Sequence, residues 1–298
     1  MTNLTRRQMI NLSVNATAGI IAIPAIAKDD QLRSNSKSFT VGDIMNIIYK
    51  EIPGAPFSQT VDTLKSGNAD QQVTGIVTTM FATVDIIRQS IALKSNFIIA
   101  HEPTFYNHAD ELDWAGNNDV AQKKLALLNE NKIAVWRLHD YLHSFKPDSV
   151  RYGVVKKMGW EKYDPQSNGL INIPSTNLAQ LVADFKSKLK IKHLRVIGDQ
   201  KQSCSKIAVL PGAPGGQRQM SAAESLQPDV IVCGELREWE TAEYIRDAEA
   251  LGKKMSLILL GHAVSEEPGM EWLAGWLPGK APGVPVKHIP TPDPFQWL

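Results

Sequence analysis

The segment Asn96–Tyr106, NFIIAHEPTFY, places two polar side chains directly after a short apolar run. Residues 97–100 are Phe, Ile, Ile and Ala, which is the length and composition of a buried strand. His101 and Glu102 follow, and Pro103 cannot donate to a strand ladder, so the strand ends here. Ligands of open α/β folds bind beyond the carboxyl ends of strands. We therefore expect a ligand site here, and an imidazole beside a carboxylate favours a metal ion.

The rest of the chain alternates predicted strands with predicted helices. Strands are expected from apolar runs near residues 73–80, 133–136, 207–210, 230–233 and 255–260. Amphipathic stretches between these runs predict helices, and the alternation indicates an α/β fold with mainly parallel sheets. We expect a first α/β lobe at 38–150, a linking region at 151–194, and a similar second lobe at 195–298 that ends in an extended tail.

Residues 1–27 have the pattern of a secretory signal peptide. Arg6 and Arg7 precede an apolar stretch that ends in Ala25-Ile26-Ala27, an A-x-A cleavage site. The paired arginines indicate the twin-arginine route. A membrane anchor or a disordered tail is the alternative, but the apolar part is short and contains polar residues and a proline. We expect an exported, periplasmic or otherwise extracytoplasmic protein, with residues 28–37 as a linker.

Charge and cysteine content exclude two classes of function. The chain has 298 residues, and Arg6 and Arg7 are the only charged residues of 1–27, so its removal leaves 30 of the 32 basic residues against 31 acidic ones. Such a near-neutral chain has no basic excess with which to bind nucleic acid. Cys204 and Cys233 are the only cysteines, too few for a thiolate metal cluster. A disulfide between them remains open in an exported protein.

A second strand-end histidine occurs late in the chain, in the segment LLGHAVSE that ends at Glu266. His262 follows the apolar run 257–260 as His101 follows 97–100. Ser265 is a suitable N-cap, which would place Glu266 in the first turn of a helix. Alone, Glu266 could simply be a carboxylate that favours a helix N-terminus. The histidine four residues earlier favours the interpretation of Glu266 as a metal ligand.

The third segment is His139-Asp140-Tyr141-Leu142-His143, after the strand expected at 133–136. It resembles the H-E-x-x-H helix of zinc proteases with Asp in place of Glu. That interpretation needs both histidines on one helix, for which Pro147 leaves little room, and the aspartate is one methylene short as a general base. The alternative is a loop that turns one or two of these side chains toward His101 and His262.

Three strand–histidine–acid segments in one α/β chain predict a shared metal site. Imidazole and carboxylate ligands without sulfur suit Zn, Mn, Fe or Co. Five or six such ligands exceed what one tetrahedral zinc uses, so two divalent ions that share a carboxylate are expected. The sequence PGAPGG at 211–216 lacks the lysine and spacing of a phosphate-binding loop, and a tight turn is the better interpretation.

With these blocks in hand, the chain resembles the dinuclear-metal-centre hexameric family, also known as GTP cyclohydrolase 1 type 2 homologues. The blocks are FIIAHEPTF, PDVIVCGELREWE and LLGHAVSE, and the segment VDTLKSG at 61–67 is similar to the family's start. Two positions depart from the family pattern. The second histidine of its H-H-P block is Glu102 here, and the aspartate of its H-T-N-L-D block falls on His143, so ligand count and total charge are preserved.

The resemblance implies a ligand set and an assembly. By position, the metal ligands would be His101, Glu102, His143, His262 and Glu266, with one of the two glutamates bridging. If the register of the middle segment differs, Asp140 replaces His143. His139 and Asp140 would orient ligands or carry a proton during catalysis. The family also implies two α/β lobes with the metals between them, assembled as a ring-like hexamer.

Two functions remain open from the sequence. The first is a metal-dependent hydrolase that acts on an unknown small molecule through a metal-activated water. The second is a metal-binding assembly for storage, delivery or scaffolding, and a decayed, metal-free site is a third possibility. We expect no nucleic-acid partner and no membrane contact once the signal is removed.

Overall fold

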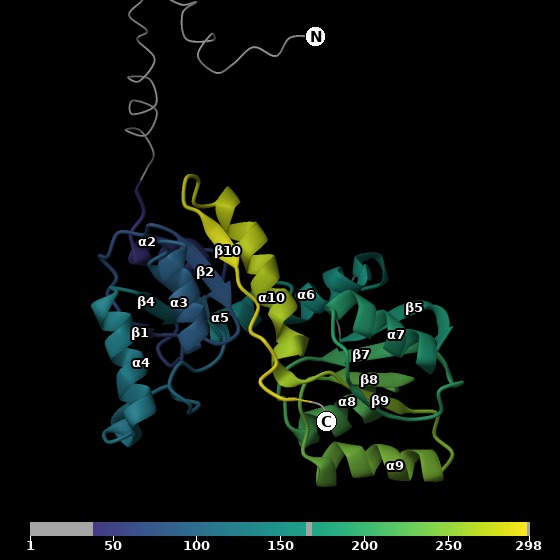
Figure 1. Ribbon diagram of the computed structural model, residues 1–298. Coiled ribbons are helices and arrows are strands. Elements are labelled where there is room, and N and C mark those ends of the chain that lie inside the picture. Colours follow the sequence, from purple (N-terminus) through teal and green to yellow (C-terminus); the bar gives the residue numbers. More distant parts are fainter. Residues whose placement is uncertain (1–37, 165–168, 297–298) are drawn as a thin grey trace, which may run out of the picture. The chain divides into compact units, whose positions relative to one another are not determined.

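The computed structural model describes residues 38–164 and 169–296, which form two five-stranded sheets with flanking helices (Figure 1). The sheets are mostly parallel, so the predicted α/β class is confirmed. The expected signal peptide at 1–27 and linker at 28–37 lie outside the described residues. Within the described part of the chain, every helix is too short or too polar to cross a membrane.

The strands are β1 (Leu64–Ser66), β2 (Ile76–Thr79), β3 (Phe97–Ala100), β4 (Ala134–Arg137), β5 (Leu170–Asn177), β6 (Arg195–Ile197), β7 (Ser203–Leu210), β8 (Val230–Cys233), β9 (Ser256–Leu259) and β10 (Val286–His288). The α-helices are α2 (Val41–Tyr49), α3 (Val84–Ala92), α4 (Asp119–Glu130), α5 (Asp140–Ser144), α6 (Ser149–Met158), α7 (Leu178–Leu189), α8 (Gly216–Leu226), α9 (Glu243–Ala250) and α10 (His262–Trp276). A π-helical turn, η3 (Glu238–Ala242), precedes α9.

The first sheet has the order β1-β4-β3-β2-β10, with β1 as its single antiparallel strand. Strands β2, β3 and β4 are buried along their whole length, as expected for a parallel sheet covered on both faces. Strand β10 comes from the C-terminal tail and pairs with β2, 210 residues earlier (Val286 opposite Ile76). The chain therefore returns to the first sheet after it has built the second.

The second sheet has the order β5-β7-β8-β9-β6, with the edge strands β5 and β6 antiparallel to their neighbours. Its central strands β8 and β9 are fully buried. Strand β5 and helix α7 belong to this sheet's core, so part of the segment 151–194 packs with the second sheet. Cys204 and Cys233 are both free thiols buried within this sheet's two apolar clusters.

Local sequence determines two helix starts as expected. Thr40 and Asp43 cap α2 reciprocally, with each side chain accepting from the other residue's backbone N–H. Thr83 caps α3 by accepting from Ile86 N. The expected N-cap at Ser265 is wrong. Helix α10 begins three residues earlier at His262, after Gly261 with φ +102°, and the Ser265 hydroxyl bonds the His262 carbonyl instead.

Helix α10 joins the two sheets. It packs on β2 and β10 of the first sheet and crosses α6, which leads into the second sheet (Figure 1). The crossing is a backbone contact between glycines: a Cβ on Gly153 would lie 2.4 Å from the backbone nitrogen of Gly269. This close approach fixes the position of α10, which carries His262 and Glu266.

Candidate metal centre

Strand register brings the first two predicted segments together. Ala100 at the end of β3 pairs with Arg137 at the end of β4, so His101 and His139 leave neighbouring strands at the same edge. Their imidazole rings stack with centroids 4.8 Å apart. The same logic acts in the second sheet, where Cys233 pairs with Leu259 and the chain then enters α10 at His262.

The structure brings the predicted ligands of β3 and α10 into direct contact. His262 Nε2 lies 3.0 Å from Glu102 Oε1 and 3.0 Å from Glu266 Oε2. His101 Nε2 lies 3.4 Å from the same Glu266 oxygen. The side chains of His101, Glu102 and Glu266 are all buried. Four of the five predicted ligands therefore form one cluster.

The middle segment, expected as a loop, is the five-residue helix α5. Asp62, 77 residues before His139, accepts hydrogen bonds from the backbone N–H groups of His139, Asp140 and Tyr141 and so initiates this helix. One helical turn places His139 and His143 on the same face, with ring centroids 5.0 Å apart. His143 Nε2 faces Glu266, 3.9 Å from its Oε1.

Asp140 points away from the cluster. Its Oδ2 accepts from the Thr60 hydroxyl and the Val61 backbone N–H, and its Oδ1 lies 2.9 Å from His139 Nδ1. Both oxygens are thus engaged, and these hydrogen bonds lower the carboxyl pKa against the effect of burial. Of the two alternatives from the middle segment, the structure turns His143 toward Glu266 and uses Asp140 to hold His139.

Four histidines around the cluster share one orientation. In each, Nδ1 contacts an oxygen that can only accept a hydrogen bond, so Nδ1 carries the proton and Nε2 is left for the cluster. The partners are Leu138 O for His101 (3.0 Å), Asp140 for His139 (2.9 Å), Asp148 for His143 (3.1 Å) and Glu235 for His262 (2.7 Å). Metal-binding histidines usually have Nδ1 in a hydrogen bond, which leaves Nε2 available to bind the metal.

The donor atoms fit a divalent cation. His101 Nε2 is buried without a hydrogen bond in the described residues and lies 3.4 Å from Glu266 Oε2, an oxygen that also lies 3.0 Å from His262 Nε2. Native proteins seldom leave a buried imidazole nitrogen without a hydrogen bond, so a cation held between this nitrogen and the carboxylate oxygen fits the site. Two overlapping groups have donor atoms within 4.8 Å of one another, His101 with His139 and His143, and His101 with Glu102 and Glu266. Nitrogen and oxygen donors of this kind suit Zn, Mn, Fe or Co.

Charge pairing sets the protonation of the cluster. Burial alone would lower the pKa of His262, but the hydrogen bonds and charges of Glu102 and Glu266 raise it to about 11. Burial opposes ionisation of Glu266, yet His101 and His262 hold its pKa well below the usual range. His139 differs, because burial and the nearby charge of His101 lower its pKa to about 4. A cation that enters must therefore displace a proton from His262, whereas His139 is already neutral at pH 7.

Several residues that shape the site were absent from the sequence-based ligand set. Arg137, fully buried, places its NH2 3.6 Å from Glu102 Oε2 and hydrogen-bonds the His101 carbonyl through Nε. Asp148 and Glu235 hold histidine Nδ1 atoms, as described above. Glu235 follows the strand run VIVC at 230–233, so its strand-end position was a usable signal. Asp148 gave no such signal, because it precedes a helix rather than follows a strand.

The turn PGAPGG, expected as a tight turn, lies against the cluster. The backbone N–H of Gly212 donates to Ser265 Oγ at 2.9 Å. Gly212 has φ +66°, and a Cβ there would lie 2.0 Å from Glu266 Oε1. Glycine is therefore required both by the backbone conformation and by the space that the Glu266 carboxylate takes.

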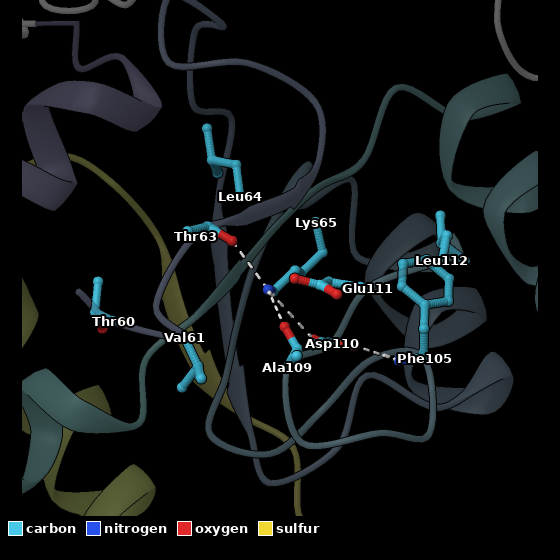
Figure 2. Close-up of a pocket in the computed structure, with 10 residues that line it drawn as sticks. All are labelled: Thr60, Val61, Thr63, Leu64, Lys65, Phe105, Ala109, Asp110, Glu111 and Leu112. Atoms are coloured by element: carbon cyan, nitrogen blue, oxygen red, sulfur yellow. Dashed lines mark hydrogen bonds and ion pairs between the residues drawn. The ribbon is translucent and has the colours of Figure 1, made fainter. Parts of the chain in front are cut away.

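A surface cavity adjoins the Asp140 side of the cluster. It has a volume of about 360 Å³ and is lined by residues of two segments, 60–65 and 105–112. Figure 2 shows the Lys65 amine directed between these segments, toward the Thr63 hydroxyl (2.9 Å) and the Ala109 carbonyl (3.5 Å). Thr60 and Val61, which also line the cavity, are the residues that bind Asp140.

Comparison with known proteins identifies the family of this chain. The sequence profile described as Duf34/NIF3 (NGG1p interacting factor 3) matches residues 39–294. The chain belongs to the Duf34/NIF3 family. A Clostridium acetobutylicum protein named GTP cyclohydrolase 1 type 2 homolog is 25% identical over 256 residues, 81% of this chain and 91% of its own length. One of the same name from Chlamydia muridarum is 24% identical over 245 residues.

Solved structures support the same fold for this Duf34/NIF3 protein. A Bacillus cereus protein related to NIF3 superposes with a TM-score of 0.70 at 16% identity, covering 88% of this chain and 100% of that one. The Staphylococcus aureus hypothetical protein SA1388 superposes with a TM-score of 0.69 at 20% identity, with 88% and 100% coverage. The resemblance to this family, stated above from the sequence, is confirmed.

Proposed function

We propose that this Duf34/NIF3 protein holds a pair of divalent cations and acts as a metal-dependent hydrolase on a small substrate. The observation that carries the proposal is the common orientation of four histidines, each with Nδ1 bonded to an acceptor, which leaves Nε2 as the available ligand atom. A bound divalent ion supplies Lewis-acid polarisation of a substrate oxygen and lowers the pKa of a coordinated water.

The chain's own residues would contribute position and proton transfer. Asp62 and Asp140 fix the orientation of α5 and His139, and Glu266 lies between the Nε2 atoms of His101 and His143. His139 is neutral at pH 7 because its pKa is lowered to about 4, so its Nε2 can act as a ligand or as a proton acceptor. The cavity beside Asp140 would admit a substrate of small-molecule size.

A second candidate is a metal-binding assembly without catalysis, for storage, delivery or scaffolding. The engagement of both Asp140 oxygens favours it, because the residue expected to carry a proton is occupied by Thr60, Val61 and His139. Metal content and turnover separate the two candidates. Elemental analysis of protein purified without chelator should find bound metal under either one, and a metal-free sample that also fails to load would reject both.

The test of catalysis uses metal-replete protein with added Mn, Zn or Co and panels of phosphoester, amide and cyclic amidine substrates. We expect turnover that is lost in His262→Ala and retained in His193→Ala, whose side chain is exposed outside the cluster. Metal-loaded protein without turnover on any panel, and with no effect of His262→Ala, would favour the non-catalytic assembly.

Export and assembly are further parts of the proposal. The twin-arginine pattern would carry a folded, metal-loaded chain to an extracytoplasmic compartment. An exported protein would meet little GTP, so the cyclohydrolase name of its relatives is not taken as its activity. Replacement of Arg6 and Arg7 by lysine should abolish export. The ring-like hexamer expected from the family would be tested by light scattering, with a monomer as the contrary result.

A further inference from the structure

We propose that the two metal positions are unequal, with a tight histidine position that prefers zinc or cobalt and a weaker carboxylate position that prefers manganese. This inference rests on the metal binding in the proposed function and assigns which residues hold which ion. The starting point is that His101 belongs to both candidate ligand groups. This chain has His143 where the family pattern has an aspartate, so three histidines can form one metal position here.

His101 can serve only one ion. Its Nδ1 lies 3.0 Å from the Leu138 carbonyl, which only accepts, so Nδ1 carries the proton and Nε2 has the single available lone pair. If His101 joins His139 and His143, the remaining donors are Glu102, Glu266 and His262. His262 already joins these three, since its Nε2 lies 3.0 Å from an oxygen of each glutamate. The six side chains therefore divide into two complete sets of three.

The histidine set is prepared for a cation by its surroundings. Carboxylates of Asp140 and Asp148 bind Nδ1 of His139 and His143, which fixes both rings and makes Nε2 a stronger donor. The three donor nitrogens lie within 4.8 Å of one another. Three histidines with one coordination place left for water or substrate is the ligand count of catalytic zinc sites.

The carboxylate set carries an opposing charge. Arg137 is fully buried, and its NH2 lies 3.6 Å from Glu102 Oε2 without a hydrogen bond in the described residues. The guanidinium remains charged at any pH of interest and so offsets one of the two glutamates. This positive charge weakens the attraction of the carboxylate set for a cation relative to the histidine set.

Ligand type then sets the preferred ion. Imidazole nitrogens favour zinc, copper, nickel and cobalt, whereas carboxylate oxygens suit magnesium and manganese. The first equivalent of Co²⁺ should therefore enter the histidine set, and Mn²⁺ should enter the carboxylate set once the first position is filled.

The test titrates the full chain, stripped of metal, with Co²⁺ followed by visible absorption and calorimetry, and then with Mn²⁺ followed by electron paramagnetic resonance. We expect a tight cobalt step with visible bands of a nitrogen-rich, low-coordinate ion. His143→Ala should raise the Kd of that step at least about tenfold. Glu102→Gln should weaken only the second step, and His193→Ala should change neither. His143→Asp, which restores the acid of the family pattern, should reduce the preference of the tight step for cobalt over manganese.

Two results would overturn the inference and leave metal binding intact. One is a tight step unchanged in His143→Ala, and the other is a tight step lost in Glu102→Gln. The absence of any cobalt binding by the unaltered chain would overturn the proposed function as well. Circular dichroism of each variant guards against misfolding, which is not expected at His143 because its side chain is 30% exposed.

Discussion

Asp148 contributes to two structures with its two carboxylate oxygens. Oδ1 caps α6 by accepting from the backbone N–H groups of Val150 and Arg151, and Oδ2 accepts from His143 Nδ1. One residue therefore starts a helix and determines the tautomer of a candidate metal ligand. The two roles can be separated by a change that preserves the cap.

We predict that Asp148→Asn weakens metal binding with little loss of stability. The amide oxygen would retain the cap, and the amide nitrogen would then face His143 Nδ1 as a donor. His143 would have to shift its proton to Nε2 and would lose its ligand lone pair. We expect metal affinity to fall about 10- to 100-fold while the denaturation midpoint stays close to that of the unaltered protein.

Asp85→Asn is the matched control, because Asp85 is an exposed first-turn acid of α3 whose side chain pairs with Arg88. Calorimetric titration with Zn²⁺ measures the affinity of both variants. Equal affinity in Asp148→Asn and the unaltered chain would show that His143 does not depend on Asp148.

Lys124 gives a pH prediction outside the metal centre. It is 4% exposed, and its amine donates to the Thr104 carbonyl at 2.6 Å. Burial, partly opposed by the charge of Asp110, lowers its pKa from 10.5 to about 8. Between these values the unfolded chain binds more protons than the folded one, so this residue makes stability rise as the pH increases from 8 to 10.5.

Lys124→Met should remove that rise, which amounts to about 3 kcal/mol at most. Urea denaturation at pH 7 and at pH 10 measures it as the difference between the unaltered chain and the variant. Lys123→Met, at a side chain that is 76% exposed, should keep the pH response of the unaltered chain. A response that is the same in all three proteins would contradict the lowered pKa.

The sequence identified the candidate ligands at strand ends but missed the residues that contact and orient them. His101 and His262 follow apolar runs that local periodicity detects. Glu235 and Arg137 act across distances of 27 and 35 residues in the chain, through contacts that exist only in the folded sheet edges. Spacing along one element carries no information on such partners.

Among the elements, the crossing of α6 and α10 controls the site most directly. Helix α6 begins beside Asp148, which holds His143, and α10 carries Glu266. A Cβ at Gly153 would lie 2.4 Å from the backbone of Pro268 and Gly269, where no side chain can move aside. The spacing between His143 and Glu266 therefore depends on the absence of a side chain at Gly153.

We predict that Gly153→Ala lowers the free energy of unfolding by about 1–3 kcal/mol and weakens metal binding by separating the two helices. Gly275→Ala, in the same helix α10 with no atom within 4 Å of the new methyl group, should be neutral or stabilise by about 0.5–1 kcal/mol. Thermal denaturation and metal titration of both variants measure the effects. A Gly153→Ala protein as stable as Gly275→Ala would disprove the tight crossing.

Helix α5 shows where prediction of elements failed. Its five residues are too few for helical periodicity to appear, and no side-chain cap within the segment begins it. Asp62, in the segment before β1, supplies the missing cap from 77 to 79 residues earlier in the chain. Because this distant cap makes the segment helical, both His139 and His143 face the cluster. A loop need not have turned both of them toward it.

At the scale of the whole molecule, the cluster joins the first sheet to the helix that follows the second. His101 and Glu102 follow β3, whereas His262 and Glu266 follow β9 on α10. Bound metal should therefore stabilise residues 38–298 as a unit rather than one lobe alone, because ligand binding to the folded state adds to the free energy of unfolding.

We predict that Zn²⁺ at 100 times its Kd raises the free energy of unfolding by about 2.7 kcal/mol per site and that excess chelator reverses the gain. Tryptophan fluorescence and far-UV circular dichroism should report a single shifted transition. His262→Ala should show a smaller gain. A transition that divides into a shifted and an unshifted part would mean that metal stabilises only one lobe.

Fold class followed from the sequence because alternating strands and helices allow few arrangements. The order of strands did not, since β10 pairs with β2 across most of the chain and β5 joins the second sheet at its edge. Periodicity predicts that a segment is a strand. Which strand it pairs with depends on the sheet edges that are available in the folded chain.

The pairing of β10 with β2 also has a consequence for biosynthesis. A nascent chain can complete its second sheet while the first still lacks an edge strand, because β10 follows every strand of the second sheet in the chain. Only a polypeptide synthesised through β10 can close both sheets, so products that terminate before Val286 would keep β2 uncovered and remain open to proteolysis.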